Sequence, residues 1–402
     1  MTPNRDIGLL FTARGLRMAA YGFVSIILAL YLRSIGWSDR RIGLLVTLTL
    51  VGDTVISLAL TTHADRFGRK RTLIIGAILM AAAGVAFVST TSFILLLVAA
   101  TIGVISPNGK EVGPFLPVEQ AALAHVIDPR RRTRLFAWYT LLGALTAAIG
   151  NQIGGVVSQF AGFHVVILLY AAVGAALAIL FTQLSPATEV ARPASGASPV
   201  KLFLGLHESR PVVMKLSALF ALDAFGGAFI MDSFLALWFK ARWNVDLLTL
   251  GAIFLVANAL AALSALVAAR IAEKFGLINT MVFTHLPSNV LLILVPLMPS
   301  AKLAVLVLWL RFSISQMDVP TRQSYTMAVV RADERSAASG VTGVARSIGA
   351  ALAPVLAGLL YGVPSLMSVP FYVAGGLKIV YDLLLYRSFV ALRPSEEIQP
   401  AI

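Results

Sequence analysis

Residues 64–72 read Ala-Asp-Arg-Phe-Gly-Arg-Lys-Arg-Thr, and residues 272–280 read Ala-Glu-Lys-Phe-Gly-Leu-Ile-Asn-Thr. These stretches match at an offset of 208 residues, and Pro-Val-Glu-Gln at 117–120 matches Pro-Thr-Arg-Gln at 320–323 at an offset of 203. Two matches at nearly the same offset indicate an internal repeat of half the chain. Because the offset falls by five between them, the first half carries about five extra residues, which we place at 107–114.

The composition is that of a polytopic membrane protein. Of 402 residues, 58% are hydrophobic and 13% are charged, with a mean hydropathy of +0.86. A soluble domain is about a quarter charged. No cysteine is present, which excludes disulfides, thiolate metal sites and cysteine nucleophiles. The polar first eight residues lead into an apolar segment without a cleavage site, so we expect no removable signal peptide.

Apolar segments of about 20 residues, long enough to cross about 30 Å of hydrocarbon, occur twelve times. They lie at 11–32, 42–63, 72–90, 93–127, 135–158, 163–184, 212–239, 247–270, 279–298, 302–330, 335–361 and 367–390. The stretch 185–211 contains four prolines and no apolar periodicity, which is typical of a linker. We therefore predict an N-terminal six-helix bundle at 1–184, a cytoplasmic linker at 185–211 and a C-terminal six-helix bundle at 212–402.

The net charge of +13 raises the question of nucleic-acid binding, which the distribution of the charge answers. Of the 32 Lys and Arg residues, 21 fall in the two tails and the loops after even-numbered spans, six fall on the opposite side and five fall within spans. This alternation follows the positive-inside rule and differs from a contiguous basic patch. It predicts a multi-pass protein of the cell inner (plasma) membrane with both termini in the cytoplasm.

Residues 61–70, which read Thr-Thr-His-Ala-Asp-Arg-Phe-Gly-Arg-Lys, resemble the loop signature G-x-x-x-D-R-x-G-R-R/K of the major facilitator superfamily. They depart from it at Thr61, where the family prefers Gly. The 6+6 repeat strengthens the resemblance. It implies an all-α membrane protein of 12 transmembrane helices, arranged as two pseudo-symmetric six-helix halves around a central cavity.

The resemblance also implies roles for particular residues. In the family this loop belongs to a cytoplasmic charge network that stabilises the outward-open state, so Asp65, Arg66, Gly68 and Arg69 are expected to act in gating. The alternative is that the basic residues only anchor the topology. Residues 150–155, Gly-Asn-Gln-Ile-Gly-Gly, are similar to the family's antiporter signature G-P-x-x-G-G except for Asn151. Close helix packing by small residues is the other interpretation.

Ionisable residues inside the spans are the candidates for substrate binding and proton coupling, because burying a charge in a bilayer costs at least ~2.5 kcal/mol. The candidates are Asp53, Lys110, Glu111, Glu119, Asp223, Arg311, Asp318 and Arg322. Lys110, Glu111 and Glu119 share the stretch 105–125, whose three prolines and two glycines predict a broken helix that lines a cavity. Glu119 and Arg322 are equivalent under the repeat, so we expect them to face each other, as a switch or as a permanent salt bridge.

Other intramembrane residues have weaker assignments. Asp53, alone in its span, is either a proton carrier or a hydrogen-bonded structural residue. Asp223 and Asp232 are two and a half turns apart on one predicted helix, so at most one should face the cavity. Arg311, Asp318 and Arg322 should form a stripe along span 10.

Two further patterns concern pairing and metals. Lys378 and Asp382, spaced i,i+4, are expected to satisfy each other. The five histidines have no metal-ligand spacing, so no metal site is assigned.

No Walker A, G-x-S-x-G or H-E-x-x-H motif occurs in the sequence, and we expect neither an enzyme nor a bound cofactor. The leading hypothesis is a secondary active transporter that works by alternating access, in which a small-molecule substrate leaves the cell in a proton-coupled step. One alternative is an exporter of an inorganic ion, a metal or metalloid, that uses the broken fourth helix. Another is a non-transporting receptor or scaffold. The expected partners are the substrate, protons and the lipid bilayer, without nucleic acid, and the protein is expected to be a monomer.

Overall fold

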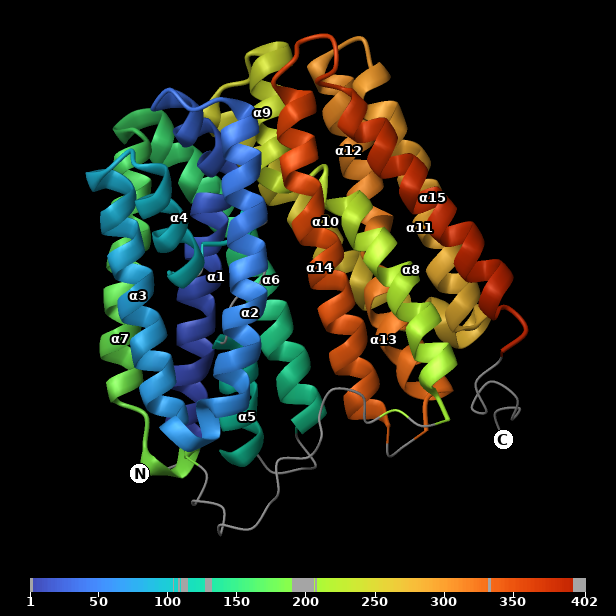
Figure 1. Ribbon diagram of the computed structural model, residues 1–402, viewed down its shortest axis with the longest axis horizontal. Coiled ribbons are helices and arrows are strands. Elements are labelled where there is room, and N and C mark those ends of the chain that lie inside the picture. The colour runs from blue at the N-terminus through green and yellow to red at the C-terminus, as the bar shows by residue number, and fades with distance from the viewer. Residues whose placement is uncertain are drawn as a thin grey trace. The chain divides into compact units, whose positions relative to one another are not determined.

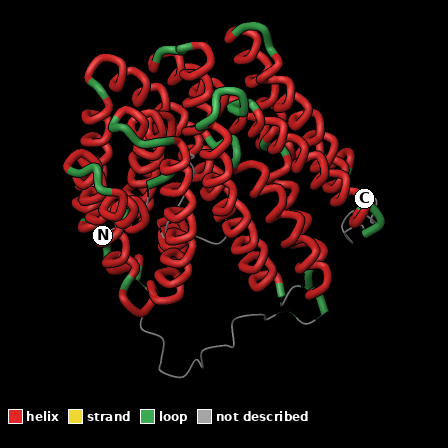
Figure 2. The backbone as a smooth tube through the Cα atoms, turned by 45° about the horizontal axis from the view of Figure 1, so that its top comes forward, coloured by secondary structure: helices red, strands yellow, loops and turns green. Residues whose placement is uncertain are grey.

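The computed structural model describes residues 3–103, 105–107, 109, 115–126, 132–189, 206, 208–331 and 334–392. These residues are helical, with no strand among them (Figure 2). The helices, labelled in Figure 1, are α1 (Pro3–Ser34), α2 (Asp39–Phe67), α3 (Arg69–Ser89), α4 (Phe93–Ile102), α5 (Phe115–Val126), α6 (Arg132–Ala161), α7 (Phe163–Thr182), η2 (Pro186–Thr188), α8 (Arg210–Ala228), α9 (Asp232–Trp243), α10 (Leu247–Phe275), α11 (Leu277–Leu294), η3 (Val295–Leu297), α12 (Ala301–Ser315), α13 (Asp318–Val329), α14 (Arg335–Tyr361) and α15 (Val369–Phe389).

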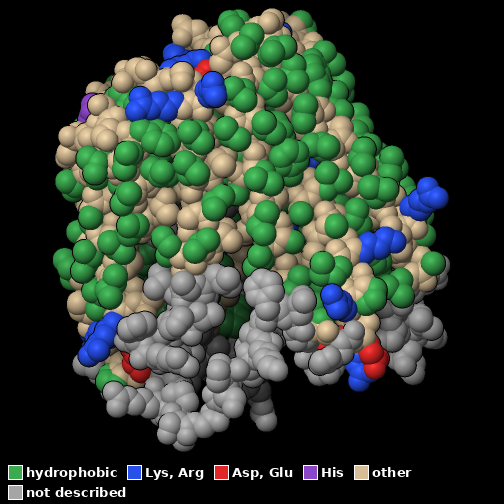
Figure 3. Space-filling view, in the orientation of Figure 1, with side chains coloured by type: hydrophobic (Ala, Val, Ile, Leu, Met, Phe, Trp, Pro, Cys, Tyr) green, Lys and Arg blue, Asp and Glu red, His purple; other side chains and the backbone are tan. Residues whose placement is uncertain are grey.

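All twelve predicted spans fall on helices, and the all-α membrane fold is confirmed. Within the described ranges, ten helical stretches are long and apolar enough to cross a membrane by length and composition. The second and fourth predicted spans are α2 and the α4–α5 pair. On the face shown in Figure 3, hydrophobic side chains cover the middle of the described surface, and most of the visible Lys and Arg side chains lie toward its ends. Large apolar side chains such as Phe160 (78% exposed) and Ile94 (70%) face outward, as lipid contact requires.

The described residues divide by contact into two compact units. Unit 1 comprises Met1–Ala197 and Met231–Asn258, and unit 2 comprises Ser198–Ile230 and Ala259–Ile402. In unit 1, α1 packs along α6 and α3 along α7, and in unit 2 the helices equivalent under the repeat make the same pairs, α8 with α14 and α11 with α15. The predicted boundaries at 184 and 211 stay a prediction. They separate the two halves of the sequence repeat, whereas these units are defined by which residues contact each other.

The repeat is also visible in the turns that begin α3 and α11. Gly68 and Gly276, 208 residues apart, precede these helices with φ of +95° and +84°, a conformation that side-chain-bearing residues rarely adopt. Four residues later, the hydroxyls of Thr72 and Thr280 donate to the carbonyls of the two glycines at 2.9 and 2.8 Å. The matched sequences therefore build the same turn twice.

Glycines allow the closest helix contacts in both units. A Cβ added at Gly150 on α6 would overlap the carbonyl oxygen of Ala19 on α1, and one at Gly349 on α14 would overlap that of Ala221 on α8. A Cβ added at Gly154 would lie 2.7 Å from the carbonyl oxygen of Phe23. These contacts give the glycines of residues 150–155 a packing function in the structure.

Three of the predicted spans are interrupted. Span 4 breaks between Ile102 and Phe115, as expected, and the hydroxyl of Tyr170 donates to the freed carbonyl of Gly103 at 2.9 Å. Span 7 was predicted as one helix, but it consists of two: α8 ends at Ala228, and α9 begins at Asp232. The periodicity argument that related Asp223 to Asp232 is therefore wrong.

Span 10 is interrupted as well. Helix α12 ends at Ser315 and α13 begins at Asp318. The reason is Pro320, which lacks an N–H and whose ring opposes the carbonyl four residues earlier, that of Gln316. Arg311 therefore lies on a different helix from Asp318 and Arg322, and the continuous stripe is not formed.

Candidate functional site

Each unit contains one cluster of buried charged side chains. The Glu119 cluster of unit 1 consists of Arg14 and Arg17 on α1, Glu119 on α5 and Tyr139 on α6. Two guanidinium nitrogens of Arg17 donate to the two carboxylate oxygens of Glu119, the contact to Oε2 being 2.7 Å, and the hydroxyl of Tyr139 also donates to Oε2. All three side chains are fully buried. A bidentate Arg–carboxylate pair is among the strongest hydrogen-bonded arrangements in proteins.

Arg14 joins the Glu119 cluster through its contacts with Tyr139. Its Nε donates to the backbone carbonyl of Tyr139 at 2.8 Å, and its guanidinium carbon lies 4.5 Å from the centroid of the Tyr139 ring. Gly143 leaves room for it, since a Cβ there would lie 2.6 Å from Nε of Arg14. The sequence analysis missed Arg14 and Arg17 because it counted both as cytoplasmic. Their position inside the apolar segment 11–32, three residues apart, was the signal that could have identified them.

The Asp223 cluster of unit 2 is larger. Asp223 on α8 receives Lys378 Nζ on Oδ1 at 2.5 Å, and its Oδ2 lies 3.3 Å from Arg322 and 3.6 Å from Arg346. Its other members are His285, Asn289, Asp318 and Asp382, so that helices α8, α11, α13, α14 and α15 all contribute to it.

Three carboxylates balance three cations in this cluster. Arg322 donates to Oδ2 of Asp318 at 2.9 Å, four residues earlier on α13. Asp382 is held by His285 Nδ1 at 2.8 Å and by the Asn289 amide at 2.9 Å. The expected Lys378–Asp382 pair is therefore not formed, because Lys378 reaches across to Asp223 instead. Sequence analysis missed His285, since a lone histidine carries no signal without knowledge of its neighbours.

The structure gives Glu119 and Arg322 partners other than each other. Glu119 pairs with Arg17 in unit 1, and Arg322 pairs with Asp318 and Asp223 in unit 2. Both residues are buried, as predicted from the repeat. A switch in which the two meet stays a prediction.

The remaining candidates lie apart from these contacts or outside the described residues. Asp53 is half-buried on α2, and Arg311 is buried on α12 with its guanidinium carbon 5.0 Å from the Phe312 ring centroid. Lys110 and Glu111 lie outside the described residues. Within the part of the chain that is described, no group of three or more His, Cys, Asp or Glu residues could hold a metal ion.

The predicted gate is built around a capped helix. The backbone N–H groups of Arg69 and Lys70, which begin α3, donate to the two carboxylate oxygens of Glu189 at 2.8 and 2.9 Å. Lys70 Nζ donates to the carbonyls of Thr182 and Leu184 at the end of α7, at 2.6 and 2.8 Å. The side chains of Asp65 and Arg66 are outside the described part, so their gating role, like that of Gly68 and Arg69, stays a prediction.

A sequence profile of the Major Facilitator Superfamily matches residues 10–351. The chain belongs to this superfamily. It is 29% identical to the uncharacterized membrane protein YJR124C of Saccharomyces cerevisiae, over 97% of this chain and 95% of that protein. It is also 26% identical to the quinolone resistance protein NorA of Staphylococcus aureus, over 39% of each chain.

Solved structures of other major facilitator proteins share the fold. The nucleoside transporter NupG has a TM-score of 0.81 at 14% identity, covering 96% of this chain and 100% of that chain. A bacterial homolog of the human lysosomal transporter Spinster has a TM-score of 0.70 at 16% identity, covering 96% and 95%. This major facilitator protein is therefore a multi-pass membrane transporter and not an enzyme.

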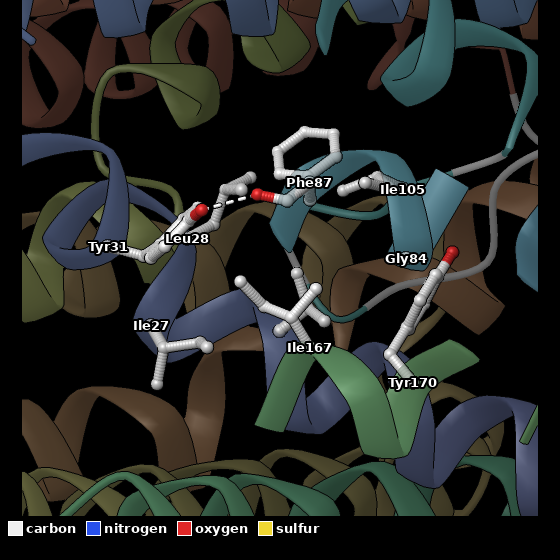
Figure 4. Close-up of a pocket in the computed structure, with 9 residues that line it drawn as sticks. Ile27, Leu28, Tyr31, Gly84, Phe87, Ile105, Ile167 and Tyr170 are labelled. Atoms are coloured by element: carbon white, nitrogen blue, oxygen red, sulfur yellow. Dashed lines mark hydrogen bonds between the residues drawn. The ribbon is translucent and has the colours of Figure 1, made fainter. Parts of the chain in front are cut away.

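A small apolar pocket of this transporter lies in unit 1 beside the break of span 4 (Figure 4). Its lining residues are Val24, Ile27, Leu28, Tyr31, Gly84, Phe87, Ile105, Ile167 and Tyr170. The hydroxyl of Tyr31 donates to the Phe87 carbonyl and that of Tyr170 to the Gly103 carbonyl. Because both polar groups of the lining are engaged with the backbone, the pocket offers a ligand only apolar contact, and the charge clusters remain the better site candidates.

Proposed function

We propose that this transporter moves a small molecule out of the cytoplasm by alternating access and that protons drive the movement. The observation that carries the proposal is the Asp223 cluster, in which five charged side chains and a histidine are buried within spanning helices of one unit and a sixth charge, the half-buried Arg346, lies beside them. Buried charges seldom stabilise a fold more than apolar residues of the same volume would. Inside a membrane they commonly belong to substrate and proton pathways.

Proton coupling is supported by the composition of this cluster. Its histidine, His285, is the side-chain type that changes charge near neutral pH, and it lies against Asp382 and near Asp223. The outward direction is supported by the relative named for quinolone resistance. We also propose that the protein is a monomer in the inner membrane with both termini in the cytoplasm.

The experiment uses purified protein in proteoliposomes that contain a pH-sensitive dye. A panel of drug-like compounds, metal ions and oxyanions is first screened by thermal shift, and each hit is then tested for flux under an imposed pH gradient. We expect flux of an organic hit to move protons, and Asp223→Asn to abolish pH-driven flux. Glu208→Gln should not, because Glu208 is a surface residue paired with Arg331, its side chain 74% exposed.

The outcomes separate the alternatives. Proton-coupled flux of metal ions or oxyanions alone would replace the small-molecule proposal with the inorganic-ion alternative. Substrate flux without proton movement would end the proton-coupling proposal. Binding without any flux from well-reconstituted protein would favour a receptor.

A further inference from the structure

His285 lies between two carboxylates that come from two other helices. Its Nδ1 is 2.8 Å from Oδ1 of Asp382 on α15, and its Nε2 is 3.8 Å from Oδ1 of Asp223 on α8. All three side chains are at least nine-tenths buried. Asn289, one turn further along α11, donates to the second oxygen of Asp382 at 2.9 Å and fixes that carboxylate in place.

The two distances indicate which nitrogen carries hydrogen. An ionised carboxylate only accepts hydrogen bonds, so we assign a hydrogen to Nδ1 from its short contact to Asp382. The Asn289 amide nitrogen, 3.2 Å from Nδ1, then gives its hydrogen to Asp382 alone. A neutral imidazole has a single N–H, which leaves Nε2 as a bare lone pair facing Asp223. Two acceptors do not approach within hydrogen-bond distance, and the separation of 3.8 Å fits this state.

The oxygen that faces Nε2 is already in use. Oδ1 of Asp223 accepts from Lys378 Nζ at 2.5 Å, so the ammonium group and the imidazole converge on one atom. If Nε2 gained a proton, its new N–H would donate to the second lone pair of Oδ1, and the imidazolium would repel the Lys378 ammonium bound to the same oxygen. Protonation of His285 would thus weaken the link that Lys378 makes between α15 and α8.

We propose that Nε2 of His285 is the proton-binding atom of this transporter, and that Asp223 Oδ1 exchanges Lys378 for the imidazolium when the proton binds. The step adds one proton to a neutral imidazole, and no other bond forms or breaks except the hydrogen bonds around Oδ1. The proposal rests on the proposed proton coupling and assigns it to a specific group. It gives the proton a mechanical effect, because the Lys378–Asp223 ion pair is a polar link between α15 and α8 within their apolar contact.

Other charged and titratable groups set the potential at His285. They are Asp223 on α8, Asp318 and Arg322 on α13, Arg346 on α14, and Lys378, Tyr381 and Asp382 on α15. Helix α12, which also packs against α11, carries the buried Arg311. Without the added proton, the three cations of the cluster balance its three carboxylates. The proton therefore leaves one excess positive charge, which a low-dielectric interior makes costly.

The test is an NMR titration of full-length protein in lipid nanodiscs with isotope-labelled histidine. The chain has five histidines, and His285→Asn identifies the resonances of His285; if that variant does not fold, replacing the other four one at a time identifies them by exclusion. We expect His285 to carry hydrogen on Nδ1 alone at high pH and to gain one on Nε2 as the pH is lowered over the range in which the protein stays folded. An imidazole that keeps one protonation state across this range would overturn the proposal.

Variants test the exchange at Oδ1. Lys378→Gln removes the competing cation and should raise the titration midpoint of His285 by about 1 pH unit or more. Asp223→Asn should lower it. Lys302→Gln, at an exposed lysine on α12, is the matched control and should leave it unchanged. If the titration midpoint of His285 is the same in Lys378→Gln as in the unmodified protein, Lys378 and His285 do not share Asp223 Oδ1. That result would overturn the proposed exchange.

The titration and the flux assay fail independently. If His285 titrates as expected but no flux follows a pH gradient, the proposed function is wrong and the proton site stands. If flux is proton-driven while His285 does not titrate, the function stands and another group carries the proton.

Discussion

Arg17 and Glu119 compensate each other at a place where neither side chain reaches solvent. Removing one partner of a buried pair leaves the other charge uncompensated, which costs about 3–5 kcal/mol in measured cases. Exposed pairs are worth roughly 0–1 kcal/mol. The chain contains one of these too, Arg331 with Glu208, 2.6 Å apart and with side chains 55% and 74% exposed. The two pairs allow a comparison within one protein.

We expect a double-mutant cycle on Arg17→Gln and Glu119→Gln to give strong coupling. Each single change should lower the free energy of unfolding by about 3 kcal/mol, and the double change should cost clearly less than their sum. The cycle on Arg331→Gln and Glu208→Gln should be additive within about 0.5 kcal/mol. Reversible unfolding in mixed micelles measures both cycles. Additive losses at Arg17 and Glu119 would mean that the two side chains do not depend on each other.

At this scale the sequence predicts which residues are buried better than it predicts which residues meet. Glu119 and Arg322 could be selected as buried charges because they interrupt apolar segments and match under the repeat. Their partners could not be predicted, because a partner is set by which helix faces which. Arg17 reaches Glu119 only because α1 packs against α5 and α6.

The helix ends show how local hydrogen bonds position the elements. Asp246 caps α10: its two carboxylate oxygens accept the backbone N–H and the hydroxyl of Thr249 at 2.8 and 2.7 Å. The hydrogen bonds from the Thr249 hydroxyl and backbone favour the ionised form and hold the pKa of Asp246 below its usual value. Asp246 lies outside the spans, at the start of a helix that crosses the membrane.

Asp246→Ala should lower the free energy of unfolding by about 1 kcal/mol at neutral pH. Because the folded pKa lies below the unfolded one, the ionic part of this contribution is present above the unfolded value of about 4. It is lost as the pH falls through the folded value. Thermal unfolding of both proteins from neutral pH downward should therefore show the difference shrinking at acidic pH. Asp246→Asn keeps a capping side chain and should cost only a few tenths of a kcal/mol; a pH-independent gap for Asp246→Ala would contradict the role of the charge.

Glu189 caps a helix as well. At the predicted gate, its carboxylate accepts hydrogen bonds from the first two backbone N–H groups of α3. Glu189→Ala should cost about 0.5–2 kcal/mol of stability and reduce transport, because it releases the loop that carries Gly68 and Arg69. Glu189→Gln should retain most of the stability. Flux and thermal unfolding, measured on the same preparations, check this. Full transport by a folded Glu189→Ala protein would argue that the cap is not part of a gate.

The elements themselves were predictable, whereas their interruptions were only partly so. Twelve apolar segments became helices, since length and hydropathy decide that outcome in a membrane. The break in span 4 was visible from its prolines. The break in span 10 follows from Pro320, whose effect a continuous apolar run conceals. The break after Ala228 follows two glycines, Gly226 and Gly227, which are poor helix formers.

For the whole molecule, the repeat was the most informative property of the sequence. It predicted equivalent turns at Gly68 and Gly276 and equivalent helix pairs in the two units, and both occur. It could not predict the different charge clusters of the units, because equivalent positions carry different side chains, as Glu119 and Arg322 do. The fold is thus symmetric in its backbone and asymmetric in its chemistry.

Membrane orientation is the prediction that belongs to this scale. With Arg14 and Arg17 buried in α1, 19 of the 21 Lys and Arg residues assigned to the cytoplasmic side remain in the tally, against six on the other side. The excess still predicts that both termini lie in the cytoplasm.

Labelling of introduced cysteines tests this orientation. Since the chain has no cysteine, a reagent that reacts with a single introduced cysteine shows on which side of the membrane that residue lies. Lys274→Cys at the end of α10 and Lys302→Cys at the start of α12 are both exposed and are predicted to lie on opposite sides. A membrane-impermeant maleimide should label Lys302→Cys in right-side-out vesicles and Lys274→Cys only in inside-out vesicles. The reverse pattern would invert the topology, and with it the proposed direction of transport.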